Sequence, residues 1–139
     1  MISRYCHKLD TIDNFRNVPY TPIKININFP DHETSDRVNG LNAILGDDLV
    51  AVSNGHGTLD IIVKGYNKAH GLQLLADKYG FTADQILAFG DGGNDKEMLQ
   101  YAKYSYAMDN ATEDVKEVAR FMAPSNDEDG VNQILEFYL

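Results

Sequence analysis

The sequence predicts an α/β fold in which a small α+β unit precedes a partial Rossmann-like parallel sheet. Two observations lead to this prediction. The first part of the chain shows alternating strands and a hairpin turn, whereas short apolar strands and amphipathic helices follow each other in series in the second part. Three such strand–helix repeats predict parallel strands with helices on the faces of the sheet. We therefore divide the chain into residues 1–58 and residues 59–139.

The first clear element is a strand over residues 23–29. Apolar side chains at every second position alternate there with polar ones such as Lys24 and Asn26. This pattern is typical of a strand with one buried face and one face in water. Pro30 ends the strand, and residues 32–45 carry the apolar contacts of a helix.

A β-hairpin is predicted next. Residues 49–53 and residues 58–63 are rich in β-branched and other apolar side chains, and Asn54-Gly55 lies between them. Asn-Gly favours a hairpin turn because both residues tolerate positive φ angles. The first unit is therefore expected to be largely antiparallel.

The second unit begins with a predicted helix that ends at Gly80, a favourable residue after a helix C-terminus. Residues 86–89 follow as an apolar run without alternation, which is typical of a strand buried on both faces. Residues 104–108 and residues 121–123 are the next two predicted strands. Three helices are predicted from apolar residues with helical spacing: Leu72, Leu75, Ala76 and Tyr79; Val115, Val118 and Ala119, with Met122 either on this face or already in the next strand; Val131, Ile134, Leu135 and Tyr138.

Composition excludes several classes of function. The net charge of −9 argues against a nucleic-acid surface, which needs clustered Lys and Arg, and against an anionic membrane surface. The single cysteine, Cys6, cannot form an internal disulfide, and no apolar run is long enough to span a membrane. A cytoplasmic location is therefore expected.

Candidate chemistry is concentrated after the strand at residues 86–89. Asp91 follows this strand directly, and ligands of open parallel sheets bind beyond the carboxyl ends of the strands. The two glycines after Asp91 permit a close backbone approach, while Asn94 and Asp95 begin a helix whose N-terminus favours anions. This arrangement suits a magnesium ion and a phosphate. Asp-Gly-Gly is equally typical of a plain turn, with Asn94 acting only as a helix cap.

Four segments, in the same order, resemble motifs of haloacid dehalogenase-type phosphatases, specifically the Cof-type branch with a large inserted cap. The resemblance extends from about residue 59 to the C-terminus and is weaker over residues 1–58, which would be the distal part of the cap. The segments are Lys64-Gly65-Tyr66-Asn67-Lys68-Ala69, the run from Ala88 to Leu99 that contains Gly90-Asp91-Gly92-Gly93-Asn94-Asp95, Ala107-Met108-Asp109-Asn110-Ala111, and Asn126-Asp127-Glu128-Asp129-Gly130-Val131.

The resemblance implies a magnesium-dependent hydrolase of small phosphomonoesters, such as sugar phosphates. Asp91 would bind Mg²⁺, and Lys68 would neutralise the phosphate and the nucleophile. Asn94 would contact the phosphate or its surroundings, and Asp95 would orient Lys68 or complete the polar shell. From the residues alone, simpler interpretations remain: Lys68 resembles a solvated surface lysine, and Asp95 suits the first turn of any helix.

The family's nucleophilic Asp-x-Asp-Gly-Thr segment is not found in the sequence. The nearest match, residues 127–131, falls where the family's closing motif belongs and is therefore rejected as the nucleophile. We expect the chain to be a fragment that begins inside the cap and is inactive by itself. Its incomplete sheet is expected to favour homodimerisation or strand exchange.

Two alternatives remain. The chain could be a non-catalytic remnant that binds phosphate or a partner protein, or a receiver-like phosphoacceptor. The second lacks the acidic pair expected at the end of an early strand.

Overall fold

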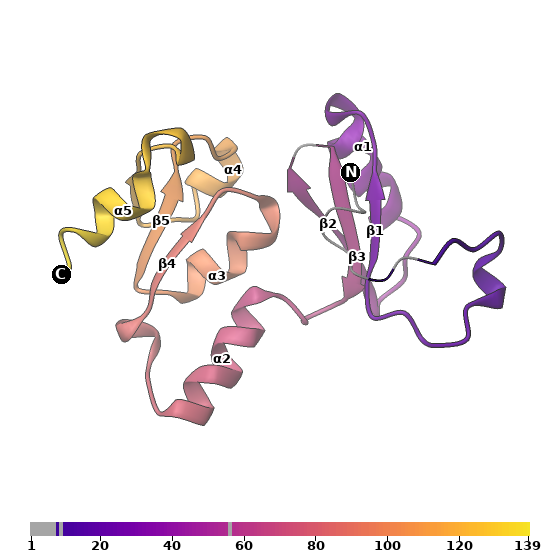
Figure 1. Ribbon diagram of the computed structural model, residues 1–139, viewed down its shortest axis with the longest axis horizontal. Helices are drawn as coiled ribbons and strands as arrows, with labels where there is room; N and C mark the ends of the chain where they lie inside the picture. The colour runs from indigo at the N-terminus through magenta and orange to yellow at the C-terminus, as the bar shows by residue number, and fades with distance from the viewer. Residues whose placement is uncertain (1–7, 9, 56) are drawn as a thin grey trace.

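The computed structural model describes residue 8, residues 10–55 and residues 57–139. An antiparallel sheet with α1 and a parallel sheet with the later helices form two neighbouring units, and α2 follows the first sheet in the chain (Figure 1). The first unit contains, in order, η2 (Phe15–Asn17), β1 (Ile25–Asn28), η3 (Asp31–Glu33), α1 (Thr34–Asn42), β2 (Leu49–Gly55) and β3 (Thr58–Val63). Within the described residues, no helix is long and apolar enough to cross a membrane.

The three strands of the first unit form an antiparallel sheet in the order β1-β3-β2. The predicted antiparallel pairing of β2 and β3 is present, but Asn54-Gly55 does not form the turn: β2 continues to Gly55, which pairs with Thr58 and has a φ of 79°, a conformation that side chains with a Cβ rarely adopt. The antiparallel sheet extends past residue 58. Because β3 pairs with both other strands, the antiparallel sheet continues to Val63, and the architecture changes only after that residue.

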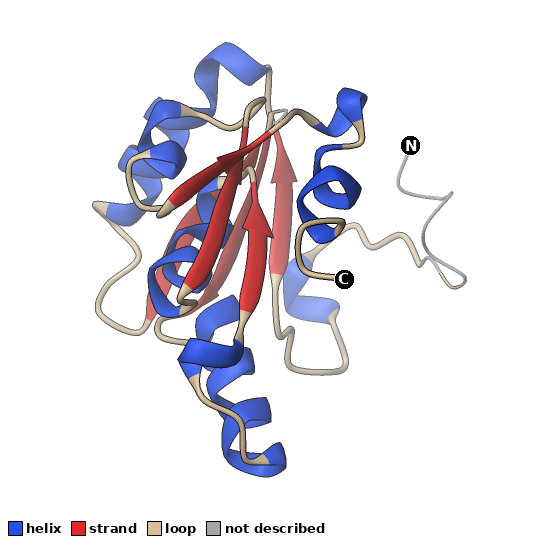
Figure 2. Ribbon diagram, turned by 90° about the vertical axis from the view of Figure 1, so that its left-hand side faces the viewer, coloured by secondary structure: helices blue, strands red, loops and turns tan. Residues whose placement is uncertain are grey.

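The second unit contains three parallel strands in the order β4-β5-β6, as predicted. Figure 2 shows strands and helices from the side and illustrates how helices flank the sheets. The α/β class and the parallel sheet expected from the sequence are therefore confirmed. Its elements are α2 (Lys68–Tyr79), η4 (Ala83–Gln85), β4 (Leu87–Gly90), η5 (Gly93–Asp95), α3 (Lys96–Tyr101), β5 (Tyr104–Met108), α4 (Glu113–Lys116), β6 (Phe121–Ala123), η6 (Asn126–Glu128) and α5 (Gly130–Leu135).

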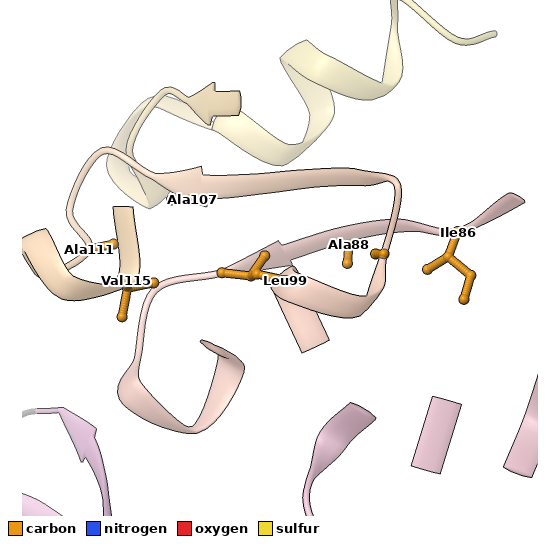
Figure 3. Close-up of a cluster of buried hydrophobic side chains, with 7 residues drawn as sticks. Ile86, Ala88, Leu99, Ala107, Ala111 and Val115 are labelled. Carbon is orange, nitrogen blue, oxygen red and sulfur yellow. The ribbon is translucent and has the colours of Figure 1, made fainter. Parts of the chain in front are cut away.

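A small apolar core holds the second unit together. Leu99 of α3 and Val115 of α4 are completely buried against the strands (Figure 3). The strands contribute small side chains to this core, including Ala88 and Ala107, so that the helices approach the sheet closely. The core therefore fixes α3, and with it the loop that precedes α3, relative to the end of β4.

Two expected burial patterns differ from the structure. The strand predicted to be buried on both faces is β4, yet Leu87 and Phe89 are only half-buried because β4 lies at an edge of the described sheet. On α2, Leu75 and Tyr79 belong to the predicted apolar face but are 46% and 66% exposed. Only Ala69 and Ala76 of α2 are buried, so this helix contributes little to the described core.

Candidate active site

The loop after β4 carries the first group of candidate residues. Asp91 directly follows the strand and is exposed, whereas Asp95, the last residue of η5, is only 4% exposed. The sequence predicted that Asn94 would cap the following helix, and this expectation was wrong. The first turn begins at Gly92, and the Asp95 carboxylate reaches back to the loop: Oδ2 accepts hydrogen bonds from the backbone N–H groups of Asp91 at 3.0 Å and Gly92 at 3.1 Å.

Gly90 is required at the end of β4 because the Asp95 side chain occupies the neighbouring space. A Cβ atom placed on Gly90 would lie 2.5 Å from Asp95 Cβ and 2.9 Å from its carboxyl carbon. A side chain at this position would therefore displace the carboxylate that organises the loop. This close approach gives a physical reason for the glycine that precedes Asp91.

Lys68 approaches the same loop from a different element. It is the first residue of α2, whose N-terminus is capped by Asn67: the Asn67 side chain accepts a hydrogen bond from the His70 N–H at 3.0 Å. The Lys68 ammonium donates to Asp95 Oδ1 and forms an ion pair with it. Because the Lys68 side chain is 49% exposed, its charge remains accessible to a ligand.

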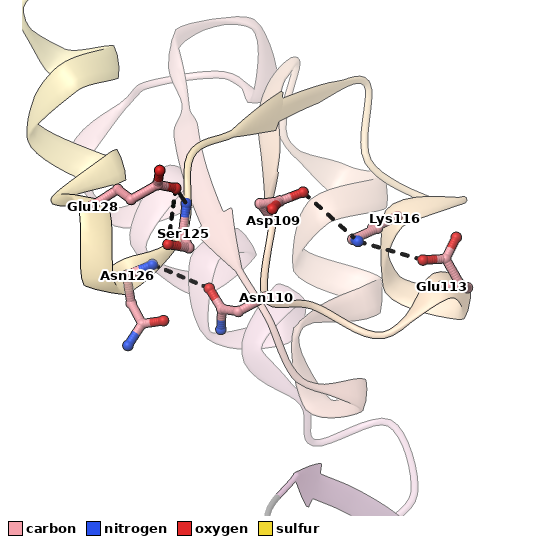
Figure 4. Close-up of polar contacts among 7 residues, drawn as sticks. All are labelled: Asp109, Asn110, Glu113, Lys116, Ser125, Asn126 and Glu128. Atoms are coloured by element: carbon pink, nitrogen blue, oxygen red, sulfur yellow. Dashed lines mark hydrogen bonds and ion pairs between the residues drawn. The ribbon is translucent and has the colours of Figure 1, made fainter.

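Asp91 is held by a residue that was not among the predicted site residues. The Asn110 side chain donates to Asp91 Oδ2 at 3.2 Å, and its Oδ1 accepts from the Asn126 N–H at 3.1 Å. Figure 4 shows the contact between Asn110 and Asn126 in the loops after β5 and β6. Asn110 therefore connects the ends of all three parallel strands. The signal for it was the segment from Ala107 to Ala111, which was recognised as a motif but given no role.

The two units meet at this loop. A Cβ atom on Gly93 would lie 3.2 Å from the Ser53 carbonyl oxygen at the end of β2, and one on Gly92 would lie 3.4 Å from that of Asn54. A cavity of about 440 Å³ lies between the units, and Lys68 and Asn94 both line it. Its other lining residues are Lys24, Val50, Val52, Asp60, Ile62, Lys64, Gly65, Tyr66, Asn67 and Glu97.

The structure thus brings Lys68, Asp91, Asn94 and Asp95 together around one loop. Asp91 does not line the cavity itself, but its backbone N–H shares the Asp95 carboxylate with Lys68. Across the described part of the chain, no three His, Cys, Asp or Glu side chains gather as a ready-made metal site. Asp91 is nevertheless an exposed carboxylate, and one of its oxygens accepts a hydrogen bond from Asn110. Such a carboxylate suits Mg²⁺, which often takes one protein carboxylate and completes its shell with phosphate and water.

Two other places lack this combination. A smaller hollow of about 260 Å³ lies between β1 and α1 and contains none of the motif residues; Ile27, Phe29 and Leu41 are among those that line it. Asp127 and Asp129, which belong to the rejected nucleophile match, are exposed residues around η6 and do not line the larger cavity. The chemistry is therefore concentrated at the end of β4.

Comparison with known proteins places this arrangement in a family. A family model described as haloacid dehalogenase-like hydrolase matches residues 3–135. The 5-amino-6-(5-phospho-D-ribitylamino)uracil phosphatase YbjI of Escherichia coli is 37% identical over 132 residues, which cover 95% of this chain and 49% of that protein.

Solved structures give the same result. The structure of SMU.1108c from Streptococcus mutans is 40% identical, with a TM-score of 0.83, and the match covers 91% of this chain and 48% of that one. The subclass IIB sugar phosphatase BT4131 is 28% identical, with a TM-score of 0.69 and coverage of 84% and 43%. The chain thus spans about half the length of the relatives it matches. With its motifs at the ends of the parallel strands, the chain belongs to the haloacid dehalogenase-like hydrolase family, as their resemblance predicted.

Proposed function

We propose that this chain supplies the phosphate-binding half of a magnesium-dependent hydrolase of small phosphomonoesters, with a sugar phosphate or a similar ester as the substrate. The observation that carries the proposal is the pairing of Lys68 with Asp95, because Lys68 and Asn94 line a cavity large enough for a small metabolite. The names of two relatives, a ribitylaminouracil phosphatase and a sugar phosphatase, support this class of substrate.

Lys68 is suited to neutralise a phosphate. A phosphoryl group in transfer spreads negative charge over its equatorial oxygens, and catalysis depends on positioned positive charge and hydrogen-bond donors. The ammonium of Lys68 has three donors, and Asp95 takes one of them. The other donors are free to serve a phosphate, while the buried Asp95 carboxylate holds the lysine in place. Asn94 lines the same cavity and offers a side-chain amide to a phosphate oxygen.

Asp91 is proposed to bind Mg²⁺. Magnesium usually takes one or two protein carboxylates and completes its shell with phosphate and water, so a single exposed aspartate beside a phosphate site fits its preferences. Asn110 donates to one oxygen of this carboxylate and thereby fixes its direction. The ion would supply a second positive charge to the phosphate. It would also explain why an acidic side chain lies beside an anion site.

Turnover requires a nucleophile that the cavity does not provide from its described residues. The carboxylates that line it are Asp60 and Glu97. Asp60 is engaged by Lys24 and Asn26, while Glu97 is an exposed residue in the first turn of α3. We therefore propose that the chain binds phosphate by itself but hydrolyses esters only with a further carboxylate from outside the described residues.

Binding of inorganic phosphate, measured by isothermal titration calorimetry with and without Mg²⁺, tests this proposal. Replacement of Lys68 by Met removes a charge-assisted hydrogen bond worth about 1.5–3 kcal/mol, so phosphate affinity should fall roughly 10-fold or more. The matched control is Lys103→Met, because Lys103 pairs with the exposed Asp84 away from the cavity. Equal affinities of the two variants would contradict the assignment of Lys68.

The metal assignment has its own readout. Mg²⁺ should strengthen phosphate binding by the unmodified chain but not by Asp91→Asn. Hydrolysis of an aryl phosphate with Mg²⁺ is then measured for the same two proteins. Activity that disappears in Asp91→Asn would show that the chain supplies its own nucleophile, with Asp127 and Asp129 as the candidates. Binding without hydrolysis is the expected result.

The edge of β4 supports the expected self-association. Among the described strands, β4 pairs only with β5, and Leu87 and Phe89 remain partly accessible. Unpaired strand edges are templates for further pairing, so we propose homodimerisation or strand exchange along β4. Light scattering over a range of protein concentrations tests this, and a chain that stays monomeric throughout would argue against it.

A further inference from the structure

Asp60 is a buried carboxylate that no motif predicted. It lies on β3, the central strand of the antiparallel sheet, and is 6% exposed. Its two oxygens have separate partners: Asn26 donates to Oδ1 at 2.7 Å, and Lys24 donates to Oδ2 at 3.0 Å. We call Lys24, Asn26 and Asp60 the β-face cluster. Both partners are on β1 or just before it, so the cluster spans two neighbouring strands.

The cluster faces the cavity rather than the interior of its own unit. Side chains alternate between the faces of a strand. Ala51 and Leu59 are buried on the face that α1 covers, so Val52 and Asp60 lie on the opposite face, where they line the cavity. Lys68 and Asn94 line the same cavity from the second unit. A ligand held at Lys68 would therefore direct its remaining atoms into a space bounded by the β-face cluster.

Asp60 remains ionised in this environment. Burial raises the pKa of the carboxyl, but hydrogen bonds from Asn26, Asn54 and Lys24, together with the Lys24 charge, outweigh burial and leave the pKa below its ordinary value. A carboxylate has about four lone-pair sites and acts only as an acceptor. Hydrogen bonds from Asn26, Asn54 and Lys24 occupy three of them, so the group can still accept a hydrogen bond from a ligand.

We propose that Asp60, positioned by Lys24 and Asn26, determines substrate specificity by accepting hydrogen bonds from hydroxyl or amine groups of the leaving alcohol. This inference rests on the proposed phosphate site at Lys68 and adds the recognition of the other end of the substrate. The apolar residues Val50, Val52 and Ile62 border the same space and suit the carbon skeleton. The chemistry selects a polyhydroxylated phosphate monoester over an ester whose alcohol carries no hydrogen-bond donors.

Equilibrium binding of three probes tests the proposal in the presence of Mg²⁺. Inorganic phosphate reports on the phosphate site alone, ribitol 5-phosphate adds hydroxyl donors, and phenyl phosphate adds an apolar group without donors. The unmodified chain should prefer ribitol 5-phosphate to phenyl phosphate. Asp60→Asn should weaken ribitol 5-phosphate about 10-fold, the value of one hydrogen bond to a charged group, and leave inorganic phosphate within about 2-fold.

Two further variants control for charge and folding. Asp77→Asn removes a carboxylate from an exposed position on α2 and should change none of the three affinities. Lys24→Met keeps the aliphatic stem of a side chain that is 53% exposed and should preserve the fold. It releases one oxygen of Asp60 from its positioning partner and should reduce the preference for ribitol 5-phosphate several-fold. Circular dichroism verifies that each variant is folded. If Asp60→Asn does not fold, the binding measurements on Lys24→Met test the proposal instead.

The outcomes separate the two levels of the argument. The role of Asp60 is overturned, and the phosphate site left intact, if phosphate binding depends on Lys68 but the unmodified chain shows no preference between the two esters. The same conclusion follows if Asp60→Asn and Lys24→Met keep the preference of the unmodified chain. Failure of the unmodified chain to bind inorganic phosphate overturns the proposed function and this inference with it. A preference lost in Asp60→Asn and Lys24→Met, but retained in Asp77→Asn, supports the proposal.

Discussion

Replacement of Asp95 by Ala should destabilise the chain strongly, whereas replacement by Asn should have a small effect. The carboxylate is 4% exposed and accepts hydrogen bonds from Lys68 and from the N–H groups of Asp91 and Gly92. Alanine removes all three interactions and leaves two backbone donors without a partner. Asparagine keeps the shape of the side chain and one oxygen that can still accept from the backbone.

The magnitude follows from the burial of each donor. The Gly92 N–H is buried, and an unsatisfied buried donor costs about 1–3 kcal/mol, while water can partly replace the partner of the less buried Asp91 N–H. Lys68 is 49% exposed, so solvent screening limits its ion pair to about 0–1 kcal/mol of stability. Asp95→Ala should therefore lower the free energy of unfolding by roughly 2–4 kcal/mol and Asp95→Asn by about 1 kcal/mol.

Urea denaturation followed by circular dichroism measures both values. The matched control is Asp84→Ala, which removes a carboxylate from an ion pair with Lys103 that is 70% and 50% exposed. This control should stay within about 0.5 kcal/mol of the unmodified chain. An Asp95→Ala variant as stable as Asp84→Ala would refute the argument that the Asp95 carboxylate holds the loop together.

Two more predictions follow from the same geometry. Gly90→Ala places a Cβ atom 2.5 Å from Asp95 Cβ and should destabilise the chain by about 1–3 kcal/mol. Gly71→Ala in α2 places a Cβ atom where no other atom lies within 4 Å and should stabilise the chain by about 0.5–1 kcal/mol. The urea midpoints of the two variants test this contrast. The lowered pKa of Asp60 means that its ionised form stabilises the folded state; this contribution is present above the ordinary pKa of 3.8 and is lost as the pH falls through the lower folded-state pKa. The difference in unfolding free energy between the unmodified chain and Asp60→Asn should therefore shrink between about pH 7 and about pH 3. A difference that stays constant over this range would contradict the prediction.

The sequence was most informative where the chemistry is local. The apolar run of β4, the glycines after it and the acidic residues at the next turn are consecutive, so their pattern predicted a strand end with a ligand site. The specific cap was wrong because two adjacent polar residues, Asn94 and Asp95, both suit a helix start. The backbone begins its turn at Gly92, so the residue three positions later, whose side chain reaches back to the start of the turn, is Asp95. The choice depends on the close packing against Gly90, which periodicity does not describe.

Asp60 shows why the remainder of the cavity lining could not be predicted. The alternation around β1 correctly gave Lys24 and Asn26 a polar face, and that face was expected to meet water. In the structure, strand pairing sets Asn26 directly opposite Asp60, and the second unit lies across the same face, so the polar side of a simple amphipathic strand becomes the wall of a cavity. The register between β1 and β3 joins residues 34 positions apart. A local pattern reports which side of a strand is polar, but only the tertiary structure decides whether that side meets solvent or lines a cavity.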